Sequence, residues 1–267
     1  MNNSGYVAGI DIGSLTAKFL ILQENTIVAQ EIIFTGASGK IAPYRVMEAA
    51  LKKANLSLDD IGYIVATGYG RISVPFADKQ VTEITCHARG AHYLVPSAKA
   101  IIDVGGQDSK VIKLGDAGKV AEFAMNDKCA AGSGRFLDVM AGALEEKVES
   151  MGSLSLKSTN RIEISSTCTV FAESEVVTHI AAGVPKEDII AGVHYSIAAK
   201  VAGLFKSRIR DKFQEAEVVM TGGVAQNIGV VRILEEKLGC KITIPPEPQT
   251  VGALGAALIA KDQVSRL

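Results

Sequence analysis

The sequence contains no tryptophan, and aromatic residues make up only 5% of its 267 residues. Hydrophobic residues still reach 48%, so the interior has to be built mainly from Ala, Val, Ile and Leu. These residues fill the buried strands and closely packed helices of α/β proteins. The composition therefore predicts an α/β fold, and the length allows one large domain or two of about 100 to 150 residues each.

The chain also lacks any long run of one charge, and its formal net charge is −1. This balance gives no sign of a nucleic-acid or membrane-surface footprint. The N-terminus shows no basic segment followed by an apolar one, and no stretch approaches ~18 uninterrupted apolar residues. We therefore expect a cytoplasmic protein that binds neither nucleic acid nor membrane.

Cysteine is scarce. The four cysteines are Cys86, Cys129, Cys168 and Cys240, and no two of them form a CxxC pair. In a reducing compartment this set does not indicate a disulfide framework.

The first specific signal is an internal repeat. The segment GIDIGSLTAKFLIL, residues 9–22, aligns with IIDVGGQDSKVIKL, residues 101–114. Each copy predicts a β-hairpin, because an apolar strand is followed by a turn with Asp and Gly and then by a second apolar strand. Asp11 matches Asp103, Gly13 matches Gly105, and Lys18 matches Lys110.

The chemistry of these turns fits a phosphate group. Backbone N–H groups of a glycine-rich turn can approach an anion closely, the hydroxyl of Ser14 adds a donor, and a nearby Asp can hold Mg²⁺ through water. A single D-x-G turn would equally make an ordinary hairpin bend. The repeat, with both aspartates in register, favours a nucleotide gripped by two turns.

Two further segments follow in the second half of the chain. VVMTGGVAQN, residues 218–227, predicts a buried strand, a double-glycine turn and a helix, which would let a nucleoside lie against backbone. Residues 249–258, QTVGALGAAL, predict a helix with small residues at 252, 253, 256 and 257. Such a helix permits close crossing at a hinge, although an ordinary Ala-rich core helix explains it as well.

Taken in order, these four elements resemble the ATPase superfamily of actin, hexokinase and the heat-shock chaperones. The resemblance implies a duplicated α/β fold with two related domains around a nucleotide cleft. We expect a first domain over residues 1–98 and a second over 99–250, with the final helix, about 251–267, packing back on the first.

Two cysteines lie close to predicted helix starts. Cys129 stands in NDKCAAGSGRF, before a helix that begins near Gly134, and Cys168 stands in ISSTCTVFAESE. A helix N-terminus carries partial positive charge, which favours a thiolate and suits a metal-bound sulfur. The alternative is that each cysteine is simply a small buried apolar residue.

If both cysteines are ligands, the coordination number matters. A [4Fe-4S] cluster or a Cys₄ zinc site needs four thiolates, and these two supply half. Either Cys86 and Cys240 complete the set, or a two-fold dimer supplies two cysteines per chain. We favour the dimer, because Cys240 opens an expected edge strand without a helix start, and Cys86 lies in the other half of the chain.

The chain is similar to a known family through six segments: NDKCAAGSGRFLDVMA, ISSTCTVFAESEV, ATGYGR, DKQVTEITCHARGA, IIDVGGQDSKVI and MTGGVAQN. They resemble the ATP-dependent activators of 2-hydroxyacyl-CoA dehydratases, which belong with the benzoyl-CoA reductase ATPase subunits. The resemblance implies a homodimer with one bridging [4Fe-4S] cluster, held by Cys129 and Cys168 of each subunit. It also implies that ATP hydrolysis drives one electron from ferredoxin or flavodoxin, through the cluster, to an iron-sulfur dehydratase or reductase.

This reading assigns roles to the turn residues. We expect Asp11 and Asp103 to hold Mg²⁺, and Gln107 or Asp108 to position the attacking water, with Asp103 beside them as a third catalytic candidate. The remaining nucleotide-binding candidates are Gly13, Ser14, Leu15, Thr16, Ala17, Lys18, Gly105, Gly106, Gln107, Gly222, Gly223, Gln226 and Gln249. Polar stretches at 67–71 and 78–87 are predicted to dock the electron acceptor, and no histidine has a spacing that indicates chemistry.

Other functions fit parts of the pattern. A small-molecule kinase of the same fold would use Asp103 as its base, but it has no need for two thiols at helix starts. A zinc-bound regulator is disfavoured because no helix-turn-helix or basic region is present. Within the favoured class, the acceptor could instead be a double-cubane cluster protein or a benzoyl-CoA-type reductase.

Overall fold

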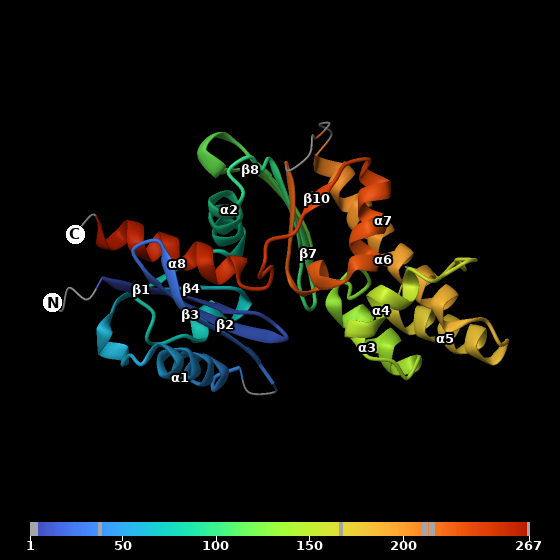
Figure 1. Ribbon diagram of the computed structural model, residues 1–267, viewed down its shortest axis with the longest axis horizontal. Coiled ribbons are helices and arrows are strands. Elements are labelled where there is room, and N and C mark those ends of the chain that lie inside the picture. The colour runs from blue at the N-terminus through green and yellow to red at the C-terminus, as the bar shows by residue number, and fades with distance from the viewer. Residues whose placement is uncertain (1–4, 37–38, 166–167, 210–212, 214–216, 266–267) are drawn as a thin grey trace. The chain divides into compact units, whose positions relative to one another are not determined.

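The computed structural model describes residues 5–36, 39–165, 168–209, 213 and 217–265 (Figure 1). The chain divides into two compact units. Unit 1 comprises Met1–Ala98, Leu114–Ala121 and Pro245–Leu267, and unit 2 comprises Lys99–Lys113 and Glu122–Ile244.

Unit 1 is built on a five-stranded sheet with the order β3-β2-β1-β4-β5. The first three strands form an antiparallel meander, while β4 and β5 run parallel to β1. The strands are β1 (Tyr6–Ile12), β2 (Thr16–Gln23), β3 (Thr26–Phe34), β4 (Ile61–Thr67) and β5 (Lys79–Gln80).

Both faces of this sheet are covered by helices (Figure 1). On β2, Phe19 and Ile21 point into the core beneath α1 (Ala42–Ala54), whereas Leu20 and Leu22 point to the opposite core. That second core is closed by α2 (Glu83–Leu94) and α8 (Val251–Val264). Because alternate side chains of a strand face opposite sides, a strand of continuous apolar residues suits a sheet buried on both faces.

Unit 2 contains a second five-stranded sheet, with the order β10-β9-β6-β7-β8. Here β6 and β7 are antiparallel, and β9 and β10 run parallel to β6. The strands are β6 (Ala100–Val104), β7 (Ser109–Leu114), β8 (Val120–Asn126), β9 (Val218–Thr221) and β10 (Ile242–Thr243). The helices are α3 (Gly134–Ala143), α4 (Val148–Ser155), α5 (Thr169–Ala181), α6 (Lys186–Arg208) and α7 (Ile228–Leu238).

The two sheets repeat one strand arrangement. In unit 1, Asp11 of β1 is the register partner of Lys18 on β2 and of Thr67 on β4. In unit 2, Asp103 of β6 stands opposite Lys110 on β7 and Thr221 on β9. The two predicted hairpins are therefore confirmed, and the repeat extends to a third strand that the hairpin alignment did not include.

The helix predictions at both cysteines and at the C-terminus are also confirmed. Helix α3 begins at Gly134, α5 begins directly after Cys168, and α8 spans most of the expected final helix. Cys240 stands just before β10, which is an edge strand as expected.

Among the described residues, one helix is long and apolar enough to cross a membrane. This helix is α6, and 72% of its most apolar window is buried inside the protein. It forms the centre of the unit 2 core, with Ile189, Val193 and Val201 fully buried. Its apolar character is thus explained by packing within unit 2.

Candidate functional site

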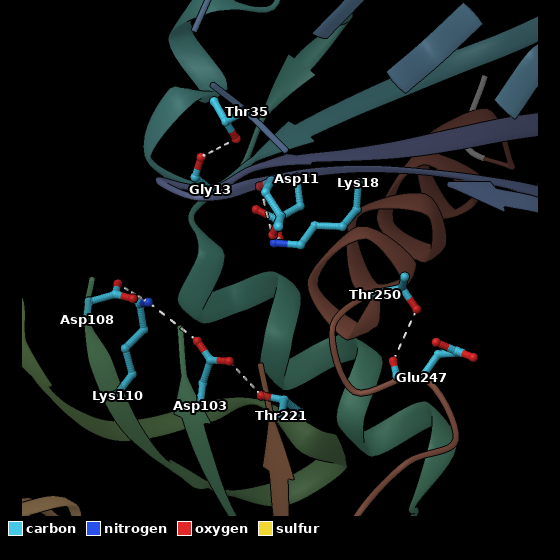
Figure 2. A network of polar contacts seen from close by, with 11 residues as sticks. Asp11, Gly13, Lys18, Thr35, Asp103, Asp108, Lys110, Thr221, Glu247 and Thr250 are labelled. Carbon is cyan, nitrogen blue, oxygen red and sulfur yellow. Dashed lines mark hydrogen bonds and ion pairs between the residues drawn. The ribbon is translucent and has the colours of Figure 1, made fainter. Parts of the chain in front are cut away.

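The first Asp-Gly turn joins β1 to β2 in unit 1 (Figure 2). The Gly13 N–H donates to the Thr16 carbonyl at 3.0 Å and closes the turn. Lys18 Nζ lies 3.2 Å from Asp11 Oδ2, and both side chains are nearly buried. The Thr35 hydroxyl donates to the Gly13 carbonyl at 3.0 Å, so the end of β3 braces the turn from outside the repeat.

The second Asp-Gly turn joins β6 to β7 in unit 2 and is more heavily linked (Figure 2). The Gly105 N–H donates to the Asp108 carbonyl at 3.0 Å, which matches the closure of the first turn. The Lys110 ammonium lies between two carboxylates, in contact with Asp108 and 3.4 Å from Asp103 Oδ2. The Thr221 hydroxyl donates to Asp103 Oδ1 at 2.9 Å.

A Thr-Gly pair ends the third strand of each repeat. Gly68 and Gly222 both have positive φ angles, 83° and 86°, and each opens a short 3₁₀ helix. A side chain at Gly68 would collide with the Asp11 carboxylate and the Ile12 carbonyl, and one at Gly222 would collide with the Val104 backbone. Glycine is required at both positions because the backbone passes directly over the aspartate strand.

The tips of the two turns offer backbone donors. Within the part of the chain that the structure describes, no group accepts from the N–H of Ser14 or Leu15 in the first turn, or of Gly106 or Gln107 in the second. Clustered N–H groups of this kind form an anion-binding concavity. Each turn is therefore suited to hold a phosphate oxygen.

Ala17 does not belong to this set. It lies inside β2, is paired with Ile12 on one side and Ile33 on the other, and its side chain is fully buried. The expectation that Ala17 contacts phosphate is wrong, because the strand ladder uses its backbone and the core holds its methyl group. Thr16 stands at the first position of the same strand and is partly exposed.

The two water-positioning candidates differ in exposure. Gln107 is exposed at the tip of the second turn, whereas Asp108 is only 5% exposed and its carboxylate contacts Lys110. An ion-paired, buried carboxylate is poorly placed to meet a water molecule. The geometry therefore favours Gln107 over Asp108.

The four candidates for nucleoside contact fall in different units. Gly222 and Gly223 lie at the turn after β9, and Gln226 is exposed at the end of the following 3₁₀ helix in unit 2. Gln249 belongs to unit 1, just before α8. Beside it, Thr250 donates to the Glu247 carbonyl and to Gln30 Oε1, both at 3.2 Å, and this fixes the start of α8 (Figure 2).

The start of helix α3 is docked onto the second turn. The N–H of Gly134 donates to the Gly105 carbonyl at 2.8 Å, and the N–H of Arg135 donates to the Gly106 carbonyl at 2.7 Å. A Cβ atom at residue 134 would lie 3.2 Å from the Gly105 oxygen, so glycine allows this close approach. The first N–H groups of α3 therefore bind the second turn.

Cys129 is half-buried in the loop between β8 and α3. The Asn126 side chain holds this loop by donating to the carbonyls of Cys129 and Ala131, at 3.0 and 3.3 Å. The Lys200 ammonium of α6 lies 3.3 Å from Cys129 Sγ. The loop that carries the thiol is therefore fixed at both ends, by Asn126 and by the docked start of α3.

Cys168 is half-buried and occupies the N-cap position of α5. The segment before it is tied to the helix, because the Ser165 N–H donates to Glu175 Oε2 at 2.5 Å. Beyond the cysteine, α5 exposes four large apolar side chains, with Val170 and Phe171 each 64% exposed, Val177 53% and Ile180 39%. Of the two thiols, this is the one that stands directly at a helix N-terminus.

The other two cysteines are poor ligand candidates. Burial raises the pKa of the Cys86 thiol to about 12, and burial together with the Glu235 charge raises the pKa of Cys240. Both shifts favour the thiol over the thiolate that binds a metal. In the described residues, no three His, Cys, Asp or Glu side chains gather closely enough to hold a metal ion.

Several residues at these sites have no clear sequence signal. Thr35 lies 22 residues from the turn that it braces, and His87 is a buried α2 residue whose Nε2 would stand 2.9 Å from a Cβ at Gly252, beside Asp11. Thr67 and His87 are buried, so they cannot form part of the predicted docking surface. By contrast, Thr67-Gly68 and Thr221-Gly222 are a repeated dipeptide that a wider self-comparison would have found.

The sequence pattern of the BadF/BadG/BcrA/BcrD ATPase family matches residues 8–260. The match covers both units, including both Asp-Gly turns, Cys129 and Cys168. The chain belongs to this ATPase family.

Relatives of the chain are similar over nearly their whole length. It is 49% identical over 259 residues to the 2-hydroxyisocaproyl-CoA dehydratase activator of Clostridioides difficile, covering 97% of this chain and 96% of that protein. Component A of the (R)-2-hydroxyglutaryl-CoA dehydratase of Acidaminococcus fermentans has a TM-score of 0.92 at 48% identity, covering 97% of this chain and 99% of the other. The Clostridium difficile activator solved with bound ADPNP has a TM-score of 0.91 at 48% identity, with 98% and 96% covered.

A more distant likeness concerns the fold alone. A ROK family glucokinase from Streptomyces griseus has a TM-score of 0.59 at 12% identity, covering 97% of this chain and all of that one. The predicted actin and hexokinase-like α/β fold is thereby confirmed.

Proposed function

We propose that this protein is a cytoplasmic, ATP-hydrolysing activator that delivers a low-potential electron to an iron-sulfur 2-hydroxyacyl-CoA dehydratase. The observation that carries the proposal is the pair of hydrogen bonds from Gly134 and Arg135 to the second Asp-Gly turn. They join a candidate phosphate site to the loop of Cys129 within one unit. The near full-length similarity to two dehydratase activators supports the same conclusion.

Each unit, which we take as one domain of the ATPase fold, carries its own candidate residues for the nucleotide. The N–H groups of Ser14, Leu15, Gly106 and Gln107 bind phosphate oxygens, and the Ser14 and Thr16 hydroxyls add donors. Leu15 contributes only its backbone, since its side chain has no polar atom. Gly222, Gly223, Gln226 and Gln249 contact the nucleoside. A relative with bound ADPNP supports nucleotide binding by this fold.

The two aspartates hold Mg²⁺ through water. Asp11 and Asp103 are 6% and 3% exposed, and each already pairs with a lysine, so direct metal coordination by either would have to displace an ammonium. Mg²⁺ retains several waters in such sites and is bound largely by the phosphates. Gln107, exposed at the turn tip, orients the attacking water, and hydrolysis converts ATP and water to ADP and phosphate.

Cys129 and Cys168 fit a cluster bridging two copies of the chain. Both are half-buried, both lie in unit 2, and together they supply two of four thiolates. When bound, a [4Fe-4S] cluster takes one electron from ferredoxin or flavodoxin and passes it to the acceptor protein. Cys168 stands at the N-cap of α5, directly at the positive end of that helix.

The homodimer is supported by the surface of α5. Val170, Phe171 and Val177 are more than half exposed within three turns of Cys168. An apolar helix face next to a thiol with an incomplete ligand set suits an interface with a second copy, in which a two-fold axis brings the same residues together.

Nucleotide state acts on the thiol loop through α3. A change in the second turn on binding or loss of the γ-phosphate moves the Gly105 and Gly106 carbonyls, and the hydrogen-bonded start of α3 moves with them. Cys129 precedes α3 in the chain, so its position relative to α6 changes. The residues thereby connect ATP hydrolysis to the environment of the electron carrier.

Anaerobic purification followed by iron, sulfide and zinc analysis tests the proposal. The wild-type dimer should contain about four irons, because a single [4Fe-4S] cluster needs the four thiolates of two chains. Cys129→Ala and Cys168→Ala should each lose iron and colour. Cys240→Ala is the matched control, since its thiol is half-buried in the same unit and is held as a thiol.

Two results would overturn the proposal. One is a colourless wild-type protein with tightly bound zinc; the other is iron bound by a monomer. Iron loss in Cys240→Ala equal to that in Cys129→Ala would reject the assignment of ligands while leaving the cluster itself in place.

A further inference from the structure

Lys200 is a charged residue that the proposed function does not use. It projects from α6, and its Nζ lies 3.3 Å from Cys129 Sγ. An ammonium is a hydrogen-bond donor only, so at this distance it donates to the sulfur. Of the two candidate ligand sulfurs, Cys129 is the one for which the described residues supply such a donor.

The lysine side chain is held in place along its length. Its Cβ, Cγ and Cδ atoms pack beside Gly132, at 3.5, 3.3 and 3.3 Å from where a Cβ of residue 132 would lie. Gly132 has a φ of 92°, a conformation that L side chains rarely adopt, so the loop is built to let the lysine stem pass. On the helix side, the neighbouring Ala198 and Val201 are fully buried and anchor α6 in the core.

The thiol is held in place from the other side. Asn126 donates to the carbonyls of Cys129 and Ala131, and Ser133 donates from its hydroxyl to the Ala130 carbonyl at 2.6 Å. Both residues of the Lys200–Cys129 contact are therefore held in place by packing or hydrogen bonds of their neighbours, unlike a mobile ion pair on the surface.

We propose that Lys200 is a positioning residue that sets the reduction potential of the cluster through Cys129. The proposal rests on the proposed function, because it needs Cys129 to be a cluster ligand. Reduction adds one electron to the site, and no bond forms or breaks at Lys200. A hydrogen bond and a positive charge at a ligand sulfur stabilise the reduced state, so Lys200 raises the potential.

The contact also explains how the loop can alter reducing power. Cys129 belongs to the loop attached to the second turn through α3, whereas Lys200 belongs to α6. A loop movement that lengthens the contact removes part of the stabilisation and makes the bound electron more reducing. Lys200 thus gives the conformational link a chemical consequence at the sulfur.

Redox titration of the anaerobically purified homodimer, followed by electron paramagnetic resonance, tests this role. Lys200→Met should lower the midpoint potential by ~59 mV, which for a one-electron step corresponds to a tenfold change in the equilibrium constant. Lys200→Arg, which keeps charge and donors, should stay near the wild-type value. The matched control is Lys206→Met on the same helix, because Lys206 is exposed and donates to the Lys237 carbonyl instead; its potential should not change.

Each outcome decides between this inference and the proposed function. A wild-type protein without iron rejects the proposed function, and this inference with it. A wild-type protein with a cluster, together with an unchanged potential in Lys200→Met, rejects this inference alone. If Lys200→Met does not retain iron, Lys200→Gln is titrated in its place, and a wild-type potential there overturns the role of the charge.

Discussion

The two Asp-Gly turns share a scaffold but differ in what is attached to it. In the first turn, Asp11 has one lysine partner, and the Gly13 carbonyl accepts from the Thr35 hydroxyl. In the second, Lys110 contacts both Asp103 and Asp108, and two backbone carbonyls accept from the start of α3. The same strand register thus supports a simple turn in unit 1 and a connected one in unit 2.

The difference between the turns distinguishes phosphate binding from transmission of the nucleotide state to the thiol of Cys129. Both turns present backbone donors suited to phosphate, so the duplication repeats an anion-binding turn in each unit. The second turn alone continues, through Gly134 and Arg135, into the segment that carries Cys129. We infer that unit 1 contributes to nucleotide binding, while unit 2 also passes the nucleotide state to the thiol.

The largest effect is expected when the lysines of the two turns are removed. Lys110→Met leaves two buried carboxylates uncompensated and should destabilise unit 2 by about 3–5 kcal/mol. Lys18→Met leaves one buried carboxylate, that of Asp11, without its lysine partner and should destabilise unit 1 by about 1–3 kcal/mol. Hydrogen exchange of β6 and β7 compared with β1 and β2, together with urea denaturation, measures the two costs separately.

Lys53→Met provides the control for this comparison. The lysine side chain is 59% exposed and that of its partner Glu31 is 29% exposed, so the change should cost at most about 1 kcal/mol. An equal or larger cost for Lys18→Met than for Lys110→Met would show that the second turn is not the more strongly coupled one.

A smaller effect is expected from acid, and it is confined to unit 2. Burial lowers the pKa of His194 from its ordinary value of 6.5 to about 3. Between these two pKa values the unfolded chain binds a proton at this histidine that the folded chain does not bind. The contribution of this histidine to stability is therefore complete above pH 6.5 and falls as the pH drops toward 3. On acidification from pH 7 to pH 5, protonation of this histidine in the unfolded chain should lower the free energy of unfolding by about 2 kcal/mol.

His194→Gln should remove that part of the pH dependence while keeping an acceptor for Asn227, which lies 3.2 Å from the ring. Urea midpoints of wild type and variant at the two pH values provide the measurement. The half-buried His179 of α5 supplies the control, His179→Gln, which should leave the pH dependence unchanged. If His194→Gln and wild type lose equal stability on acidification, the buried neutral histidine is not the cause.

Much of the fold could be predicted from the sequence because its signals are local. The apolar strands and D-x-G turns at Asp11 and Asp103 set both hairpins, and the apolar spacing after Gly134 set α3. Cys168 was correctly placed before a helix, since the apolar and charged residues that follow it are helical in pattern. These features depend on residues close together in the chain.

The remaining features depend on distant contacts. Thr35, His87 and Lys200 reach their sites only after the sheets and helices have packed. Ala17 was wrongly assigned because turn composition does not reveal where the strand begins. The docking of α3 could not be predicted, because nothing in the residues around Gly134 shows that the Gly105 and Gly106 carbonyls are their partners.

The link between the second turn and the thiol can be altered at a single atom. Gly134→Ala places a Cβ 3.2 Å from the Gly105 carbonyl and should loosen the docking of α3 with little change in stability. Gly142→Ala lies on the same helix with no atom within 4 Å of the new Cβ, and should stabilise the protein by about 0.5–1 kcal/mol.

The most direct measurement is the rate at which a ferrous chelator removes iron from the dimer, with ADP and with a non-hydrolysable ATP analogue. In wild type and Gly142→Ala the two nucleotides should give clearly different rates, because nucleotide state changes the surroundings of Cys129. In Gly134→Ala that difference should shrink or disappear while both nucleotides still bind. A full nucleotide-dependent difference in Gly134→Ala would contradict the account, because the second turn would then not act on the thiol through α3.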